Sequence, residues 1–436
     1  MRKIAGVFAC SVVVAVVATS VAWGQSLTLA KPEEVGLSSQ RLEKIGQVFT
    51  QEIDKGNLPG AVIMVARKGG IAYYESFGFQ DKSKETKMPK DAVFRIYSMT
   101  KPIVSVAAMI LMEDGRLQLT DPVSKFLPEF KDLQVSVPKT DPYGKVIYTL
   151  TPAERQPTVQ DLLRHTAGLA YGEITQNAAV KEAYVKAGVY KPDFDYNARD
   201  VTPEEEVQGL SKAPLVHQPG TAWEYSLAVD VLGRVVEKAS GKRLADFLDE
   251  RLFKPLKMVD SGFYVPQQNT QRLAEPLPKE PTTGTPNRLI DVSQPPKNDS
   301  GGAGGVSTAG DYLRFAQMMM NGGTLDGARI LSRTTVKLMT SDHLGSFINQ
   351  PMQPGELLLG TKGYTFGLGF AVRQADGVGG VPGSAGEFMW AGYAGTYFWV
   401  DPKEQVTAVL MTQAPSPNRA YFRKMVKQLV YQSIVD

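Results

Sequence analysis

The sequence predicts an α/β fold with one antiparallel sheet that is built from both ends of the chain, flanked by helices, and interrupted by an inserted, mainly helical subdomain. Strand-like stretches joined by short turns occur near both ends, at 61–74 and 387–411, and short turns favour antiparallel pairing. The long middle of the chain carries helical spacings and loops instead. We therefore expect an α/β subdomain at about 30–115 and 300–436 and a helical subdomain at about 116–299.

The first 24 residues have the pattern of a secretory signal peptide. Arg2 and Lys3 precede an apolar run at 4–17, and small residues then lead to a cleavage point near residue 24. The run is shorter than the roughly 20 residues that span a bilayer, so no stable membrane anchor is expected after cleavage. The sequence thus predicts residues 1–24 as a signal peptide and 25–436 as a mature bacterial protein that is periplasmic or secreted.

Cysteine, charge and histidine content exclude several functions. Cys10 is the only cysteine and would leave with the signal, while lipidation at this position is a less favoured alternative. Cleavage lowers the formal charge from +3 to +1, which gives no indication of nucleic-acid binding. His165, His217 and His343 lie far apart without zinc-ligand spacing, so neither a metal nor another cofactor is expected. The sequence leaves the oligomeric state open.

A helix and a hairpin are expected first in the α/β subdomain. Ser38 or Ser39 can cap a helix whose apolar residues recur every three or four positions through 42–49, which marks one buried face. Two strands follow at 61–67 and 71–74, on either side of a glycine turn, and predict an antiparallel hairpin.

Repeated helix starts and one long loop mark the middle of the chain. Thr158 opens a short helix with a capping-box pattern, and 179–187 is amphipathic. Thr202-Pro203 begins another helix with a capping threonine and a first-turn proline. Residues 263–308 are rich in Pro, Gly, Asn and Gln, and they fit either a long ordered loop over a surface or cleft or a disordered linker.

The last part of the chain is expected to return to the sheet. Residues 312–320 have a helical pattern that stops at two glycines. The remaining strands are expected at 366–372, 387–390, 395–400 and 405–411, and a closing amphipathic helix at 422–434.

Ser98 and Lys101 are the first candidates for chemistry. They are three residues apart where an extended segment, 93–97, gives way to a helical pattern, so both side chains share one helical face. An amine in that position lowers the cost of deprotonating the hydroxyl. A second Ser-x-x-Lys, Ser136 to Lys139, lies in a polar, proline-bearing stretch where no helix would hold the two groups together. Ser98 is therefore the candidate nucleophile.

A serine nucleophile also needs a proton relay and N–H donors for the developing oxyanion. Tyr225 stands at a predicted helix start, before the apolar run 228–236. Trp390-Ala391-Gly392 lies on a late strand, where its small residues let the backbone approach a substrate. Taken alone, each of these motifs is more often structural than catalytic.

The order of these motifs resembles the serine β-lactamase and penicillin-binding superfamily and, more narrowly, the family VIII carboxylesterases, which are relatives of class C β-lactamases. The resemblance runs from about residue 33 to the C-terminus and implies a β-lactamase-like α/β fold. It rests on Ser98-x-x-Lys101, Tyr225-Ser226-Leu227 and Trp390-Ala391-Gly392, with further agreement in 162–169, 225–233 and 300–308.

The resemblance implies a role for each matching residue. Ser98 would be the nucleophile, with Lys101 beside it on the same helix face, and Tyr225 would relay the proton. The N–H groups of Ser98 and Tyr393 would form the oxyanion hole, the first of them helped by the positive end of its helix. Trp390, Ala391, Gly392 and Leu227 would contact the substrate.

Two departures from the lactamase pattern favour esters. A class C lactamase would carry asparagine where Leu227 stands and lysine where Trp390 stands, to bind the amide and the carboxylate of the drug. Loss of a charge-assisted contact costs about 1.5 to 3 kcal/mol. We expect a carboxylesterase acting on small esters, with at most weak lactamase activity. The alternatives are a β-lactamase or D-amino-acid peptidase and, less favoured, a non-catalytic penicillin-recognition module.

Two other arrangements are weaker candidates. His165 suggests a Ser-His-Asp triad, but its His-Thr-Ala-Gly-Leu context resembles a structural helix end of the superfamily. Ser384 approximates a nucleophile elbow, but it lacks the first glycine and the following helix, which indicates a turn. The natural acyl and alcohol groups depend on loops around 171–200 and 263–300, whose conformation the sequence leaves open.

Overall fold

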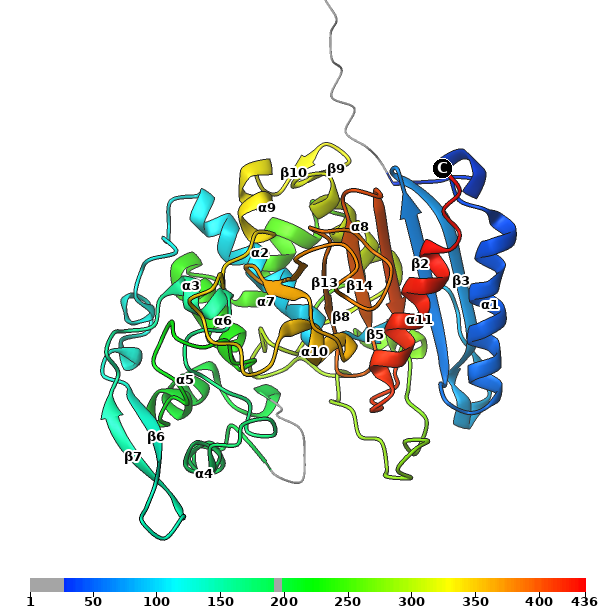
Figure 1. Ribbon diagram of the computed structural model, residues 1–436. Coiled ribbons are helices and arrows are strands. Elements are labelled where there is room, and N and C mark those ends of the chain that lie inside the picture. Colours follow the sequence, from blue (N-terminus) through cyan, green and yellow to red (C-terminus); the bar gives the residue numbers. More distant parts are fainter. Residues whose placement is uncertain (1–26, 192–197) are drawn as a thin grey trace, which may run out of the picture.

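One nine-stranded sheet forms the centre of the molecule, as the computed structural model of residues 27–191 and 198–436 shows (Figure 1). The sheet order is β1-β3-β2-β15-β14-β13-β12-β11, and β4 pairs with β3. The predicted signal peptide and Cys10 lie outside the described residues. The strands are β1 Thr28–Leu29, β2 Gly60–Arg67, β3 Gly70–Asp81, β4 Thr86–Lys87, β11 Tyr364–Phe366, β12 Ala371–Arg373, β13 Phe388–Ala391, β14 Tyr397–Asp401 and β15 Val406–Met411.

The pairing of β2 with β15 joins the two ends of the chain in the middle of the sheet. It runs antiparallel from Arg67 opposite Val406 to Val62 opposite Met411. Every other pair in this sheet is antiparallel except the short β1, which runs parallel to β3. The prediction of one sheet built from both termini is confirmed.

The strand predicted at 366–372 is wrong in detail, because that stretch is the turn of a hairpin. β11 ends at Phe366 and β12 begins at Ala371. Between them Gly369 has φ +94°, in the left-handed region that favours glycine, and a Cβ there would lie 2.4 Å from the Oγ of Ser105. The chain reverses here because a strand cannot continue through that conformation.

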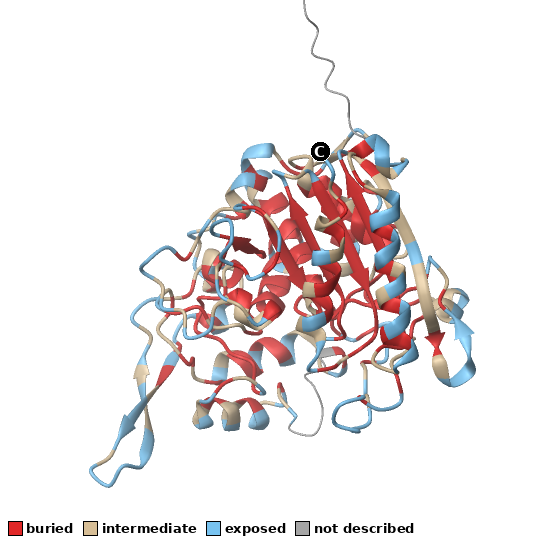
Figure 2. Cartoon of the chain, turned by 45° about the vertical axis from the view of Figure 1, so that its right-hand side comes forward, coloured by how far each residue is buried: buried red, intermediate tan, exposed pale blue. Residues whose placement is uncertain are grey.

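Helices cover both faces of the sheet. On β14, Trp399 stacks on Tyr431 of α11 (Arg419–Tyr431), whereas its neighbour Phe398 packs on Tyr312 of α8 (Ala309–Met320). Successive strand residues point to opposite faces, so α11 and α8 lie on opposite sides. α1 (Ser39–Asp54) packs on α11 and β3. Figure 2 shows the central strands buried between these layers.

Local capping signals located the helices well. Ser38 Oγ accepts a hydrogen bond from Arg41 N at the start of α1, and both Thr158 and Thr202 form capping boxes. The other α-helices are α2 Thr100–Glu113, α3 Val159–Leu163, α4 Ala178–Lys186, α5 Pro203–Lys212, α6 Ala228–Ser240, α7 Leu244–Leu248, α9 Arg333–Met339 and α10 Pro354–Leu359. The shorter helical turns are η1 Pro32–Val35, η2 Lys82–Lys84, η3 Tyr97–Met99, η4 Val123–Lys125, η5 Pro128–Phe130, η6 Ala198–Asp200, η7 Asp249–Phe253 and η8 Gln267–Arg272.

A hairpin that the sequence did not predict projects from the middle of the chain (Figure 1). It pairs β6 (Gln134–Thr140) with β7 (Val146–Pro152) and contains the second Ser-x-x-Lys motif. In a strand, residues three apart point to opposite faces, so Ser136 and Lys139 cannot act together.

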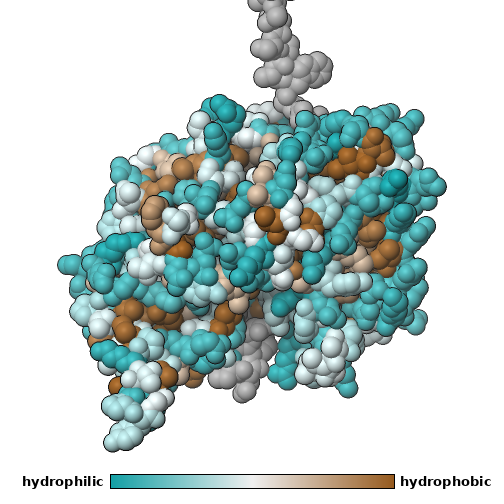
Figure 3. All heavy atoms as spheres, viewed as in Figure 1, coloured by the Kyte–Doolittle hydropathy of each residue, from teal (hydrophilic) through white to brown (hydrophobic). Residues whose placement is uncertain are grey.

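The face drawn in Figure 3 is mostly hydrophilic, with apolar groups scattered over it.

Two short strand pairs and one loop complete the described chain. The loop at 263–308 is extended and contains only η8 and β8 (Val306–Ser307), which pairs with β5 (Phe94–Arg95) beside Ser98. A further short pair is β9 (Thr324–Leu325) with β10 (Ala328–Arg329). Across 27–191 and 198–436, no helix is long and apolar enough to cross a membrane. The boundaries of the two subdomains stay a prediction.

Candidate active site

Ser98, Lys101 and Tyr225 meet at one point, although they come from two distant segments. Ser98 lies in η3, Lys101 in the first turn of α2, and Tyr225 just before α6. The Tyr225 Oη donates a hydrogen bond to Ser98 Oγ at 2.6 Å, and Lys101 Nζ donates to the same oxygen at 3.3 Å. The hydroxyl therefore has a phenol and an amine in direct contact.

Lys101 is held rigidly. Its side chain is buried, and besides Ser98 its Nζ donates to Tyr171 Oη and to the carbonyl of Gly302, both at 2.8 Å. An ammonium group has three hydrogens, and these three acceptors use all of them. The Nζ also lies 4.7 Å from the centroid of the Tyr225 ring.

Tyr171 belongs to the site, yet sequence reasoning missed it. Burial, with a smaller effect of Tyr225, raises its pKa well above the ordinary value of 10, so its phenol is neutral. The Tyr171 and Tyr225 rings pack with centroids 5.1 Å apart. No motif marks Tyr171, and only its position two residues beyond the stretch 162–169, which resembles the superfamily, could have drawn attention to it.

A buried carboxyl lies behind Lys101. Asp230 is fully buried on α6, and its Oδ1 accepts hydrogen bonds from Ser300 Oγ at 2.6 Å and Gly302 N at 3.1 Å. Burial raises the pKa of Asp230, and the charge of Lys101 partly opposes that rise. A Cβ on Gly302 would lie 2.1 Å from Asp230 Oδ2, so only glycine fits between the two groups.

The residue before the candidate nucleophile has a strained backbone. Tyr97 has φ +44°, which is unusual for a residue with a Cβ. Its hydroxyl accepts a hydrogen bond from Ile290 N at 3.0 Å, which helps to fix the turn. Strain of this kind persists where the surrounding structure holds it, and it is common at functional sites.

A cleft of about 240 Å³ opens above these side chains. Ser98 and Tyr393, the two predicted oxyanion-hole residues, both line it, as do Tyr225, Ala391 and Gly392. Its other lining residues are Tyr97, Tyr171, Glu173, Ile174, Ala303, Leu357, Leu358, Arg419 and Arg423.

Gly392 and Tyr393 are fixed closely against η3. A Cβ on Gly392 would lie 2.2 Å from Thr396 Oγ1 and 2.4 Å from the carbonyl oxygen of Ile96. From α11, Arg423 donates to the Gly392 carbonyl at 2.7 Å, and Arg419 donates to the Tyr393 carbonyl at 2.6 Å. The end of β13 is thus anchored by two arginines of α11.

The expected substrate contacts of Leu227 and Trp390 need correction. Both side chains are 1% exposed, and neither lines the cleft. Leu227 packs into the core at the start of α6. The indole of Trp390 packs on Tyr225 and Phe366, with ring centroids 5.5 and 5.3 Å away. Trp390 therefore supports the Tyr225 ring from behind.

A family model for β-lactamases matches residues 45–431, which is most of the chain. The chain belongs to the β-lactamase family. Esterase EstB of Burkholderia gladioli is 31% identical over 389 residues, covering 85% of this chain and 89% of EstB. Lovastatin esterase of Penicillium rubens is 28% identical over 396 residues, covering 85% and 92%. The solved structure of EstCE1, a hydrolase with promiscuous acyltransferase activity, matches with TM-score 0.72 and 28% identity, covering 90% of this chain and 99% of that one.

In this β-lactamase-family chain, His165 supports the site from inside the core. It is 1% exposed, its Nδ1 lies 3.1 Å from Ser226 Oγ, and its ring packs on that of Tyr225 at 5.1 Å. Burial, together with Lys101, holds the pKa of His165 well below 6.5, so the ring is neutral. Ser384 is buried beside a turn and its N–H donates to Asp401, remote from Ser98 in sequence and contacts.

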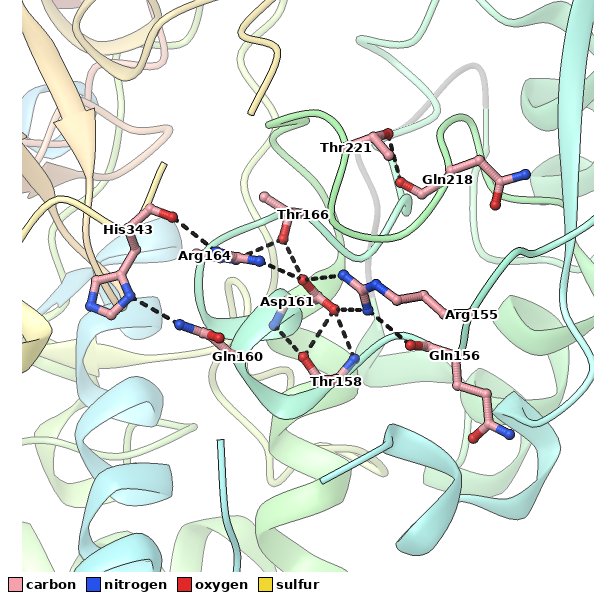
Figure 4. Close-up of polar contacts among 10 residues, drawn as sticks. All are labelled: Arg155, Gln156, Thr158, Gln160, Asp161, Arg164, Thr166, Gln218, Thr221 and His343. Atoms are coloured by element: carbon pink, nitrogen blue, oxygen red, sulfur yellow. Dashed lines mark hydrogen bonds and ion pairs between the residues drawn. The ribbon is translucent and has the colours of Figure 1, made fainter. Parts of the chain in front are cut away.

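The segment that carries His165 is tied down by Asp161 (Figure 4). This fully buried carboxylate accepts hydrogen bonds from Arg155, Arg164, Thr158 and Thr166 at 2.6 to 3.1 Å. Burial alone would raise the pKa of Asp161, but these donors outweigh it and hold the pKa below 3.8.

Across the described ranges, no three His, Cys, Asp or Glu side chains are placed to hold a metal ion.

Proposed function

We propose that this protein is a serine hydrolase that cleaves small carboxylic esters through an acyl-enzyme on Ser98. The observation that carries the proposal is the contact of Ser98 Oγ with both Tyr225 Oη and Lys101 Nζ. A serine hydroxyl is a weak nucleophile unless a neighbouring group accepts its proton. The names of EstB and lovastatin esterase, two relatives, support ester cleavage.

The neutral phenol of Tyr225 donates to Ser98 Oγ in the structure, so acylation begins after this phenol has released its proton to solvent, and the resulting phenolate takes the proton of Ser98. The positive charge of Lys101, close to the Tyr225 ring, favours negative charge on the phenol oxygen. Ser98 Oγ then forms a bond to the ester carbonyl carbon, and the carbonyl electron pair moves onto oxygen. When the tetrahedral intermediate collapses, the C–O bond to the alcohol breaks and Tyr225 passes its proton to the leaving oxygen. Water repeats the sequence to release the acid.

The N–H groups of Ser98 and Tyr393 hold the oxyanion during these steps. Both residues line the cleft, and Gly392 lets β13 approach η3 closely enough to bring Tyr393 to Ser98. Removing one such donor typically costs about 10²- to 10³-fold in kcat.

The cleft favours a small, mainly neutral acyl group. Its volume is about 240 Å³, and Ile174, Leu357, Leu358 and Ala303 contribute apolar walls. The positions where a lactamase would carry an amide and a lysine hold the buried Leu227 and Trp390.

β-Lactam hydrolysis is the second candidate function, favoured by one observation. Arg419 lines the cleft, and a guanidinium is well suited to bind a drug carboxylate. Comparing kcat/KM for a short-chain p-nitrophenyl ester and for a chromogenic cephalosporin separates the two candidates. We expect the ester to be the better substrate, and a preference for the cephalosporin would reverse the assignment.

Covalent labelling tests the nucleophile directly. We expect a fluorophosphonate to add once per chain at Ser98, as seen by mass spectrometry of the digested protein, and Ser98→Ala to abolish both labelling and ester cleavage. Ser136→Ala, in the second Ser-x-x-Lys motif, is the matched control and should keep both. A wild-type protein without an adduct would instead be a non-catalytic recognition module.

We further propose that the protein is exported to the bacterial periplasm or beyond, because residues 1–24 have the pattern of a signal peptide. N-terminal sequencing of the protein from cell fractions tests this. A mature N-terminus near Gln25 in the periplasmic fraction is expected, whereas an intact Met1 on cytoplasmic protein would refute export.

A further inference from the structure

The peptide unit between Gly392 and Tyr393 connects the cleft to a buried cation. Its N–H belongs to Tyr393, which lines the cleft, and its C=O belongs to Gly392 and accepts a hydrogen bond from Arg423 Nη2 at 2.7 Å. A trans peptide is planar, and its N–H and C=O point in opposite directions. A donor that fixes the carbonyl therefore also fixes the direction of the N–H.

Arg423 has an unusual environment for a charged side chain. It is 4% exposed, and its hydrogen bonds go to two carbonyl oxygens, those of Gly392 and Leu358. Within 27–191 and 198–436, none of the ion pairs includes Arg423, and its Nε has no hydrogen-bond partner. Buried cations are normally paired with a carboxylate because an unpaired one is costly.

The charge of Arg423 remains in place at neutral pH. Burial, and to a smaller extent Arg419, lowers the pKa of Arg423 from its usual range to about 9. A cation at the carbonyl end of a peptide draws electron density toward that end, so the N–H at the other end becomes a stronger donor. In a poorly solvated site its positive potential also reaches the cleft.

We propose that Arg423 is a positioning residue of the oxyanion hole: it orients the Gly392–Tyr393 peptide and strengthens the Tyr393 N–H as a donor to the developing oxyanion. This inference rests on the proposed function, since an oxyanion forms only if Ser98 is acylated. It explains why a costly unpaired cation is kept at this place in α11. Interactions made only with the transition state affect kcat more than KM.

The test uses Arg423→Met, which removes the charge and the donors, and Arg423→Lys, which keeps the charge. We expect Arg423→Met to lower kcat for a short-chain ester by about 10- to 100-fold with KM changed less than threefold, because the Tyr393 N–H is weakened and not deleted. Arg423→Lys should recover part of the loss. Lys424→Met is the matched control, since it removes a charge from the next residue of α11, which is only partly buried, and should keep kcat.

A spectroscopic measurement separates positioning from a general loss of structure. In an acyl-enzyme with an isotopically labelled carbonyl, oxyanion-hole donors lower the carbonyl stretching frequency. We expect Arg423→Met to raise that frequency. The rates are normalised to the fraction of protein that a fluorophosphonate labels, so that unfolded protein does not lower the measured kcat.

Each outcome decides a separate point. An unchanged kcat and an unchanged carbonyl frequency in Arg423→Met overturn the inference and leave the esterase proposal intact. A raised KM at constant kcat also overturns it, because Arg423 would then bind substrate directly. If a fluorophosphonate does not label Ser98 of the wild-type protein, the proposed function itself is overturned.

Discussion

Replacing Asp161 with asparagine should destabilise the protein strongly while changing its shape little. In the structure each carboxylate oxygen accepts three hydrogen bonds, which come from Arg155, Arg164, Thr158 and Thr166. An asparagine amide can replace only one of the two oxygens, so its NH₂ group must face N–H and O–H donors whichever way it turns.

The loss of stability expected for Asp161→Asn depends on how exposed its two arginine partners are. Removing one partner of a buried ion pair typically costs about 3 to 5 kcal/mol when the other charge stays buried. Here the side chains of Arg155 and Arg164 are 43% and 16% exposed, so both can regain water. We therefore expect Asp161→Asn to lower the free energy of unfolding by about 3 kcal/mol, at the lower end of that range.

Equilibrium unfolding in urea at several pH values provides the assay. The pKa of Asp161 is lower in the folded protein than its usual 3.8, so its stabilisation is present above that value and is lost as the pH falls through the folded pKa. The difference between wild type and Asp161→Asn should be constant from about pH 5 to 7 and should shrink below about pH 4.

A surface carboxylate supplies the control. Asp376 is exposed and pairs with the exposed Lys403, so Asp376→Asn should leave the unfolding midpoint where it is. A loss below about 1 kcal/mol for Asp161→Asn, or a difference that does not shrink in acid, would refute the reasoning about charge and hydrogen bonding.

Three further outcomes are expected. Burial raises the pKa of Asp311 from 3.8 to about 6, so its contribution to stability is complete below about pH 4 and is lost as the pH rises through 6. In urea unfolding, the free energy of unfolding of Asp311→Asn should therefore rise by roughly 3 kcal/mol relative to that of wild type between pH 4 and 7. A difference that stays constant with pH would contradict this. Gly392→Ala should push β13 away from the carbonyl of Ile96. It should lower kcat at least tenfold, which corresponds to the loss of about one hydrogen bond. A variant with wild-type kcat would show that the strand can shift without loss of activity. Tyr171→Phe removes an acceptor from the buried Lys101 and should cost about tenfold in kcat/KM, measured with the same ester; equal kcat/KM would show that Lys101 needs only its other two partners.

Local chemistry explains which parts of the fold and site could be predicted. Caps at Ser38, Thr158 and Thr202 act within one helical turn, so their residues suffice to place the helix starts. Ser98 and Lys101 are likewise related by helix geometry alone. Tyr225 has no local signature, and only the order of motifs shared with a known superfamily indicated its role.

The remaining site residues depend on contacts that no local pattern contains. Tyr171 and Asp230 reach Lys101 because separate segments pack around it, directly or through Gly302. Arg423 looks like an ordinary helix residue until α11 is placed against β13. The substrate role expected of Trp390 was wrong because its alternation on the strand turns the indole inward, onto Tyr225.

The central pairing of β2 with β15 also sets the order of events in a growing chain. β2 leaves the ribosome early, but its partner strand is made more than 300 residues later. Contacts between such distant segments fold slowly, and the peptide at Tyr393 can meet Ser98 only after the same late strands arrive. The nascent polypeptide therefore remains catalytically inert until translation is almost finished, and a truncated product would be inactive as well as unstable.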